Sequence, residues 1–191
     1  MQMWFISDTH FGHENIIKYS QRPFANAREM DAALVANWND RVKPQDHIYH
    51  LGDVTMNRGG KVQQDIFQRF IKQLHGHKRL ILGNHDHFPI EAYLHAGIEK
   101  IYGTWRGIGD GRWVISHIPI HPGSMGSAHA NIHGHIHQNP NPDPVLHVSK
   151  EGQIIVKPYV NLSVEVTNYA PIPIEEVQQR VAAIQAAWGS A

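Results

Sequence analysis

Leu80-Ile81-Leu82-Gly83-Asn84-His85-Asp86 is the stretch on which the fold of this chain depends. An apolar run that ends in glycine and continues with an amide, an imidazole and a carboxylate predicts a buried strand with polar groups at its carboxyl end. The carbonyl oxygen of Asn84 suits a hard cation, and His85 and Asp86 can transfer or orient a proton. An ordinary turn is the alternative, because glycine and asparagine both favour turns.

Length and composition favour a single domain over residues 1–191. The hydrophobic content of 41% and the mean hydropathy of −0.40 are ordinary for a soluble globular protein. The chain has no cysteine, which excludes disulfides, thiolate zinc sites and cysteine nucleophiles, so any metal ligands are nitrogen and oxygen atoms. No apolar stretch approaches the roughly 20 residues of a membrane span, and Met1–Asp8 lacks the features of a signal peptide. We therefore expect a cytoplasmic protein.

Charge and histidine content narrow the class of function. Lys+Arg and Asp+Glu balance at 17 each, so no net charge attracts a nucleic acid or an anionic membrane. The 16 histidines are spread among expected strand ends and loops, without the run that marks a purification tag. This distribution indicates metal ligation or proton transfer by several of them.

Asp8 and His10 follow the first expected strand, Met3–Ser7. In extended geometry, side chains two residues apart project to the same side, so both could reach one cation. The alternative is that Asp8 caps a helix, such as the one that residues 13–19 suggest.

The same pattern recurs later in the chain. Asp53 follows a second apolar run, and His117 follows the run Trp113–Ser116. His121, four residues further on, is a rival for the same role. We prefer His117 because it lies directly at the end of the strand.

Residues 130–137 hold the densest group of histidines. In extended geometry His133, His135 and His137 would lie on one side, and Gly134 would let the backbone approach whatever they hold. Together with the earlier candidates, these histidines are too many ligands for one cation.

Apolar spacing predicts helices between the expected strands. They cover Ala27–Val42, Val62–Leu74, Ile90–Ala96 and Ile174–Trp188. Further strands are expected in Gln153–Val156 and Tyr159–Val166, closing a sheet. The alternation of strands and helices predicts an α/β fold.

The nitrogen and oxygen ligands at expected strand ends are too many for one ion: Asp8, His10, Asp53, Asn84, His117, His135 and His137. Two cations about 4 Å apart would bracket an in-line phosphoryl displacement. The motifs D-x-H, G-D, G-N-H-D, a single His and G-H-x-H occur in this order over residues 8–137. In this respect the sequence resembles the calcineurin-like metallophosphoesterases.

The resemblance implies two sets of metal ligands bridged by Asp53. One set is Asp8, His10 and His137, and the other is Asn84, His117 and His135. It also implies a fold of two stacked mixed β-sheets flanked by helices, an αββα sandwich.

Further roles follow from the resemblance for residues near the ligands. His85 would contact the phosphate and protonate the leaving oxygen, with Asp86 orienting it. His133 and His13 lie outside the ligand pattern and are interpreted as rim residues or as residues behind the ligands. Arg58 is a candidate phosphate contact, although it is one residue out of register with the arginine of the protein-phosphatase branch and is more commonly a solvated loop residue.

The expected activity is hydrolysis of a phosphomonoester or phosphodiester by attack of a metal-bound hydroxide. We expect manganese ahead of iron, zinc, nickel or magnesium as the divalent metal. The expected partner is a small phosphoester, and no membrane contact is expected. The sequence predicts no particular oligomeric state. A nuclease is the alternative, and a binding scaffold and a histidine-rich metal buffer are the rivals from other classes.

Overall fold

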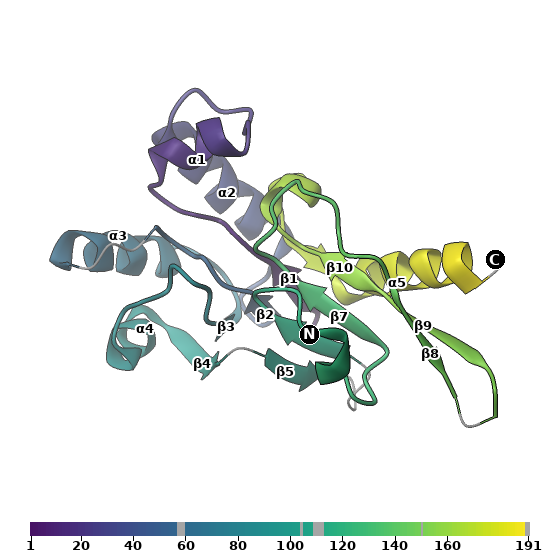
Figure 1. The fold of residues 1–191 in the computed structure, drawn as a ribbon. Coiled ribbons are helices and arrows are strands. Elements are labelled where there is room, and N and C mark those ends of the chain that lie inside the picture. The colour runs from purple at the N-terminus through teal and green to yellow at the C-terminus, as the bar shows by residue number, and fades with distance from the viewer. Residues whose placement is uncertain (57–59, 104, 109–112, 150, 190–191) are drawn as a thin grey trace.

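The computed structural model describes residues 1–56, 60–103, 105–108, 113–149 and 151–189 (Figure 1). Its larger sheet has the strand order β11-β1-β2-β3-β4. These strands are β1 (Met3–Ile6), β2 (His47–His50), β3 (His77–Ile81), β4 (Ile98–Tyr102) and β11 (Ile172–Pro173). Strands β1 to β4 are parallel and β11 is antiparallel, so the sheet is mixed.

The second sheet has the order β10-β7-β6-β5 and is also mixed. Its strands are β5 (Trp105–Ile108), β6 (Trp113–Ser116), β7 (Ala130–His133) and β10 (Tyr159–Asn161). Only β5 pairs antiparallel to its neighbour. A separate antiparallel ribbon, β8 (Val145–Val148) with β9 (Ile154–Lys157), extends away from the rest of the fold in Figure 1.

The strands of the larger sheet bury side chains on both faces, because successive residues point to opposite sides. Phe5 and Tyr49 belong to the core that joins the two sheets, whereas Ile6 and Ile48 pack under the helices. Ile115 of β6, in the second sheet, packs in the same core as Phe5 and Tyr49. The two sheets are therefore stacked through a continuous apolar layer.

Helices cover the other face of the larger sheet (Figure 1). These helices are α1 (Glu14–Tyr19), α2 (Ala27–Arg41), α3 (Lys61–Ile71) and α4 (Ile90–Ala96). Helix α5 (Ile174–Gly189) instead packs Val177 and Val181 on the core that joins the two sheets. Two short 3-10 turns are η1 (Pro122–Ser124) and η2 (Val164–Val166). Helix α2 begins after Asn26, whose side chain accepts a hydrogen bond from the Glu29 backbone N–H, and buries Met30, Leu34 and Trp38 every four residues.

The expected α/β class with two stacked mixed sheets and flanking helices is confirmed. Strands β4 and β5 had not been predicted and separate the strand before Asn84 from the strand before His117. Two local expectations were wrong. The end of the run expected as a strand, 164–166, forms η2, and the run 154–157 pairs with β8 instead of closing a sheet. Strand β9 forms an antiparallel hairpin with β8, which keeps residues 154–157 out of the second sheet.

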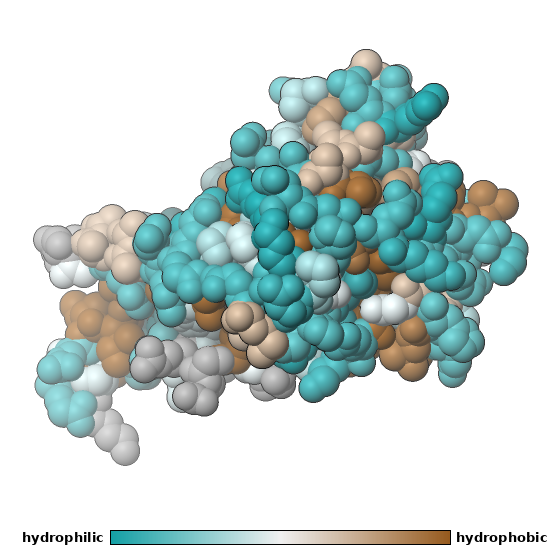
Figure 2. Space-filling view, turned by 180° about the vertical axis from the view of Figure 1, so that it is seen from behind, coloured by the Kyte–Doolittle hydropathy of each residue, from teal (hydrophilic) through white to brown (hydrophobic). Residues whose placement is uncertain are grey.

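Figure 2 shows the face opposite to that of Figure 1, where hydrophilic residues predominate and apolar residues show in small separate areas. Within the described residues, no helix is long and apolar enough to cross a membrane.

Candidate metal centre

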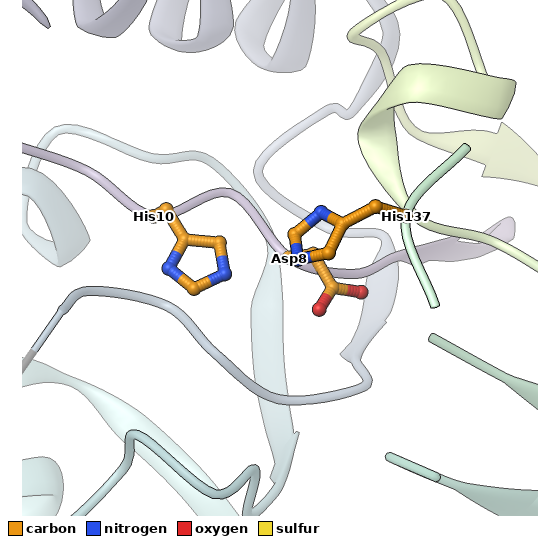
Figure 3. Close-up of side chains that lie close together, drawn as sticks. All are labelled: Asp8, His10 and His137. Atoms are coloured by element: carbon orange, nitrogen blue, oxygen red, sulfur yellow. The ribbon is translucent and has the colours of Figure 1, made fainter. Parts of the chain in front are cut away.

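The expected ligands converge where the strands of both sheets end. The structure contains two groups of three residues, and within each group the potential ligand atoms lie within 4.8 Å of one another. The first group is Asp8, His10 and His137, and the second group is Asp53, His117 and His135. Figure 3 shows the first group, with His137 reaching from the segment after β7 toward Asp8 and His10, which follow β1. Each group has the nitrogen and oxygen donors of a transition-metal site.

Asp53 lies between the two groups. Its Oδ2 atom is 3.6 Å from His10 Nε2 in the first group and 3.4 Å from His117 Nε2 in the second. Asn84 joins the second group, because its Oδ1 atom is 2.9 Å from His117 Nε2. All seven expected ligands are therefore brought together, with Asp53 at the position of a bridge.

Five of the seven expected ligands have a left-handed backbone: Asp8 (φ 58°), His10 (φ 50°), Asp53 (φ 58°), His135 (φ 72°) and His137 (φ 53°). The extended geometry expected for the D-x-H segment and for the three histidines of residues 133–137 was therefore wrong. Sharp turns directly after the strands bring these side chains together instead. Such conformations cost on the order of 1–3 kcal/mol each in non-glycine residues and cluster at functional sites.

Glycines let the backbone approach two of the carboxylates. A Cβ on Gly134 would overlap Ser7 Oγ and Asp8 Oδ2, and a Cβ on Gly83 would overlap the Asp53 side chain. Gly134 thus allows a close approach, as its place in the motif suggested, and what it approaches is Asp8.

Asp86 has a different set of contacts from the one expected. Its carboxylate, which is 7% exposed, accepts hydrogen bonds from the backbone N–H groups of Asp53 (2.7 Å), Val54 (3.2 Å) and Gly83 (2.9 Å). Burial raises the pKa of this carboxyl to about 6. The described contacts include none between the Asp86 carboxylate and the imidazole of His85. Asp86 holds the turn that carries Asp53, and the expected orientation of His85 by Asp86 has no contact to support it.

His85 is tied to the site through its backbone. Its N–H donates to Asp53 Oδ1 at 2.8 Å, and its ring Nε2 is 3.9 Å from Asp53 Oδ2. The side chain is 30% exposed, so the ring lies beside the two groups and is open to a substrate.

The charges of the site are strongly coupled. Burial opposes the charged form of His117, but the neighbouring carboxylates of Asp53 and Asp8 outweigh it and raise the pKa of His117 to about 9. Burial also opposes ionisation of Asp53, yet the hydrogen bond and charge of His117, with His10, hold the pKa of Asp53 below its usual range. Burial lowers the pKa of His10, which stays neutral and able to bind a cation.

Unsatisfied polar atoms test whether these residues suit a metal. Asp8 Oδ1 and both ring nitrogens of His10 are buried without a hydrogen-bond partner among the described residues. Buried polar atoms are almost always paired, because an unpaired one costs about 1–3 kcal/mol. A cation held by Asp8, His10 and His137 would satisfy Asp8 Oδ1 and one of the two ring nitrogens of His10, so the donor set fits a metal.

The remaining histidines separate into different roles. His133 is fully buried, with Nδ1 2.8 Å from the Gly134 carbonyl oxygen, and burial lowers its pKa to about 4. His13 is the N-cap of α1, and its ring centroid lies 5.5 Å from that of His10. His121 is exposed and accepts a hydrogen bond from a backbone N–H of η1, so His117 and not His121 joins the ligands.

A cavity of about 310 Å³ lies beside the first group. It is lined by His10, His13, Ile16, Tyr19, Ser20, Met56, His85, His137, Gln138 and Asn139. Arg58 lies outside the described residues.

Two buried charged residues that the sequence had not marked as parts of the site lie behind the first group. Glu165 Oε1 is 2.9 Å from His137 Nδ1, and Arg22 NH2 is 2.8 Å from the same oxygen. No motif marks either residue, since their proximity depends on the tertiary fold.

No family model matches the chain. The uncharacterized protein MJ1445 of Methanocaldococcus jannaschii is 33% identical over 177 residues, covering 91% of this chain and 88% of that protein. The crystal structure of a protein of unknown function from Aquifex aeolicus, AQ665, has a TM-score of 0.68 and 30% identity over 93% of this chain and 98% of that one. An archaeal phosphodiesterase is more distant, with a TM-score of 0.46 and 17% identity over 84% of this chain and 82% of that one. The chain belongs to the family of the uncharacterized protein MJ1445.

Proposed function

We propose that this protein is a two-metal phosphoesterase of the calcineurin-like type, which hydrolyses phosphomonoesters or phosphodiesters of small molecules or nucleotides. The observation that carries the proposal is the position of Asp53. Its Oδ2 atom lies within 3.6 Å of a ring nitrogen in each of two groups that could hold a metal. Two groups joined by one carboxylate are the arrangement that a two-metal site for in-line phosphoryl displacement uses.

When bound, two divalent cations would supply the nucleophile and neutralise charge on the phosphate oxygens. Asp53 would hold the two positions at a fixed separation. His85 faces the same space with a partly exposed ring, from which Nε2 can donate a proton to the leaving oxygen. We propose manganese as the metal, with iron, zinc, nickel or magnesium as alternatives. The cytoplasmic location stays a prediction.

The cavity supports a small substrate with an uncharged organic part. None of the described residues that line it is lysine or arginine, whereas Ile16, Tyr19 and Met56 give it apolar and aromatic walls. His85 lines the same cavity, so we place the leaving group there. Its volume of about 310 Å³ suits a group of the size of a nucleoside.

A nuclease is the second candidate, because lysines and arginines follow the first two ligand motifs. Arg22 cannot contact a polynucleotide at the surface, since it is 4% exposed and pairs with Glu165. The burial of this arginine favours the small phosphoester over a polynucleotide.

The other two rivals are disfavoured for separate reasons. A degenerate binding scaffold would be expected to have lost ligands, yet all seven converge. A metal buffer would not need Asp53 between the groups or an open cavity beside them.

Turnover on mononucleotide-sized esters and on oligonucleotides, with manganese at low and moderate salt, tests the proposal. We expect the small esters to be hydrolysed with little dependence on salt. Efficient cleavage of oligonucleotides, with an advantage that falls steeply as salt rises, would establish the nuclease instead. Turnover of neither class by the metal-loaded protein would refute both.

A further inference from the structure

We propose that Arg22 and Glu165 form a positioning pair, which fixes the geometry of the first group, Asp8, His10 and His137. The proposal rests on the metal binding that the proposed function requires. The pair touches the metal ligands from behind and lies outside the residues that line the cavity.

Arg22 holds the segment that carries two of the ligands. Its NH2 group donates to the backbone carbonyl of Asp8 at 2.7 Å, and its NH1 group donates to that of Thr9 at 2.9 Å. Asp8 and His10, on either side of Thr9, both have left-handed backbones. Such backbones persist only where surrounding contacts fix them, and a buried guanidinium with several rigid donors provides such contacts.

Glu165 fixes the third ligand. Its Oε1 atom lies 2.9 Å from His137 Nδ1, and a carboxylate only accepts hydrogen bonds, so Nδ1 carries the proton. The free lone pair of the ring is then on Nε2, which is left to ligate a metal. The Arg22 side chain donates to the same carboxylate oxygen from NH2 (2.8 Å) and Nε (2.9 Å), which keeps Glu165 in place.

The pair acts on one group and not on the other. In the second group, His117 Nδ1 lies 2.9 Å from the backbone carbonyl oxygen of Leu51, and His135 Nδ1 lies 3.2 Å from His117 Nε2. Among the described contacts, neither histidine has Arg22 or Glu165 as a partner. Loss of the pair should therefore weaken one metal position selectively.

Glu165→Gln and Glu165→Ala test the proposal, with Glu176→Gln as the matched control. Glu176 also pairs with an arginine, Arg180, at 2.7 Å, but on the surface of α5. Calorimetric titration with Mn²⁺ should show one ion bound as in the wild type and the other weakened about 10- to 100-fold by Glu165→Ala, with a smaller loss for Glu165→Gln. Circular dichroism checks that each variant is folded, and the control should bind like the wild type.

Nitrogen-15 NMR of the metal-free protein gives a readout that does not depend on activity. The wild type should show His137 with the proton on Nδ1, and Glu165→Ala should show a mixture of tautomers. Wild-type Mn²⁺ affinity at both positions in a folded Glu165→Ala variant, an unchanged tautomer, or equal weakening of both ions would overturn the proposal. If the wild type hydrolyses no phosphoester, the proposed function fails, and the tautomer and binding data still decide the role of the pair.

Discussion

Gly134→Ala should damage the metal centre and leave the rest of the fold in place. The new Cβ would overlap Ser7 Oγ and Asp8 Oδ2 and lie 2.7 Å from Ser7 Cβ. Ser7 and Asp8 are both fully buried, so neither can move aside into solvent. The segment that contains Gly134 and His135 must therefore shift away from Asp8.

The magnitude follows from two contributions. Overpacking of a buried position typically costs about 1–3 kcal/mol. The shift also breaks the 2.9 Å hydrogen bond from the His135 N–H to the Asp8 carboxylate, and a hydrogen bond to a charged group contributes about 1.5–3 kcal/mol. The free energy of unfolding should fall by about 2.5–6 kcal/mol, and both groups should lose metal affinity, because Asp8 and His135 belong to different groups.

Urea unfolding of the metal-free protein and calorimetric titration with Mn²⁺ measure the two effects. Gly103→Ala is the control, because a Cβ there meets nothing within 4 Å, and its effect should stay within about 0.5 kcal/mol. If Gly134→Ala unfolds and binds Mn²⁺ like the wild type, the close packing of Gly134 on Asp8 is not what shapes the site.

Three further predictions concern single residues. Asp53→Asn should remove the charge between the two groups, weaken Mn²⁺ binding and abolish turnover, as elemental analysis and a phosphoesterase assay would show. His85→Ala should keep its metals and lose rate by about 10²- to 10⁴-fold, less for an ester with a nitrophenolate leaving group, as steady-state kinetics would show. His50 accepts a hydrogen bond from the Gly52 N–H, and burial lowers its pKa to about 3. Its contribution to stability is complete above the unfolded pKa of about 6.5 and is lost as pH falls toward 3, by up to about 1.4 kcal/mol per pH unit. The free energy of unfolding of the metal-free wild type, measured with urea, should therefore fall more steeply with decreasing pH than that of His50→Gln.

Each of these predictions has an outcome that contradicts it. An Asp53→Asn variant that binds two ions as the wild type does would show that Asp53 does not bridge them. A His85→Ala variant without metals would make His85 a ligand. Equal acid dependence in the wild type and His50→Gln would mean that His50 titrates in the folded protein much as in the unfolded one.

The convergence of the candidate ligands could be predicted from the sequence because each follows an apolar run, and the carboxyl ends of parallel strands meet at one edge of a sheet. Asp53 and Asn84 were found in this way from their neighbours alone. The turns that aim the side chains could not be predicted, because left-handed conformations at residues such as Asp8 and His137 are unfavourable locally and depend on tertiary contacts.

The residues that support the ligands were beyond prediction for a related reason. Arg22 and Glu165 are 143 positions apart, and no local pattern connects them. Asp86 was recognised as part of a motif but given the wrong contact, since its neighbour in sequence, His85, is not the neighbour of its carboxylate in space. Sequence motifs therefore indicate the candidate ligands more readily than the residues that position them.

The most direct test of the central claim is a titration of metal-stripped protein with Mn²⁺, in which bound metal and hydrolysis of a nitrophenyl phosphoester are measured on the same samples. Two groups bridged by Asp53 predict no turnover without metal and a rate that saturates at two ions per chain. Full turnover in the stripped protein, or maximal turnover with one ion per chain, would contradict the two-metal account.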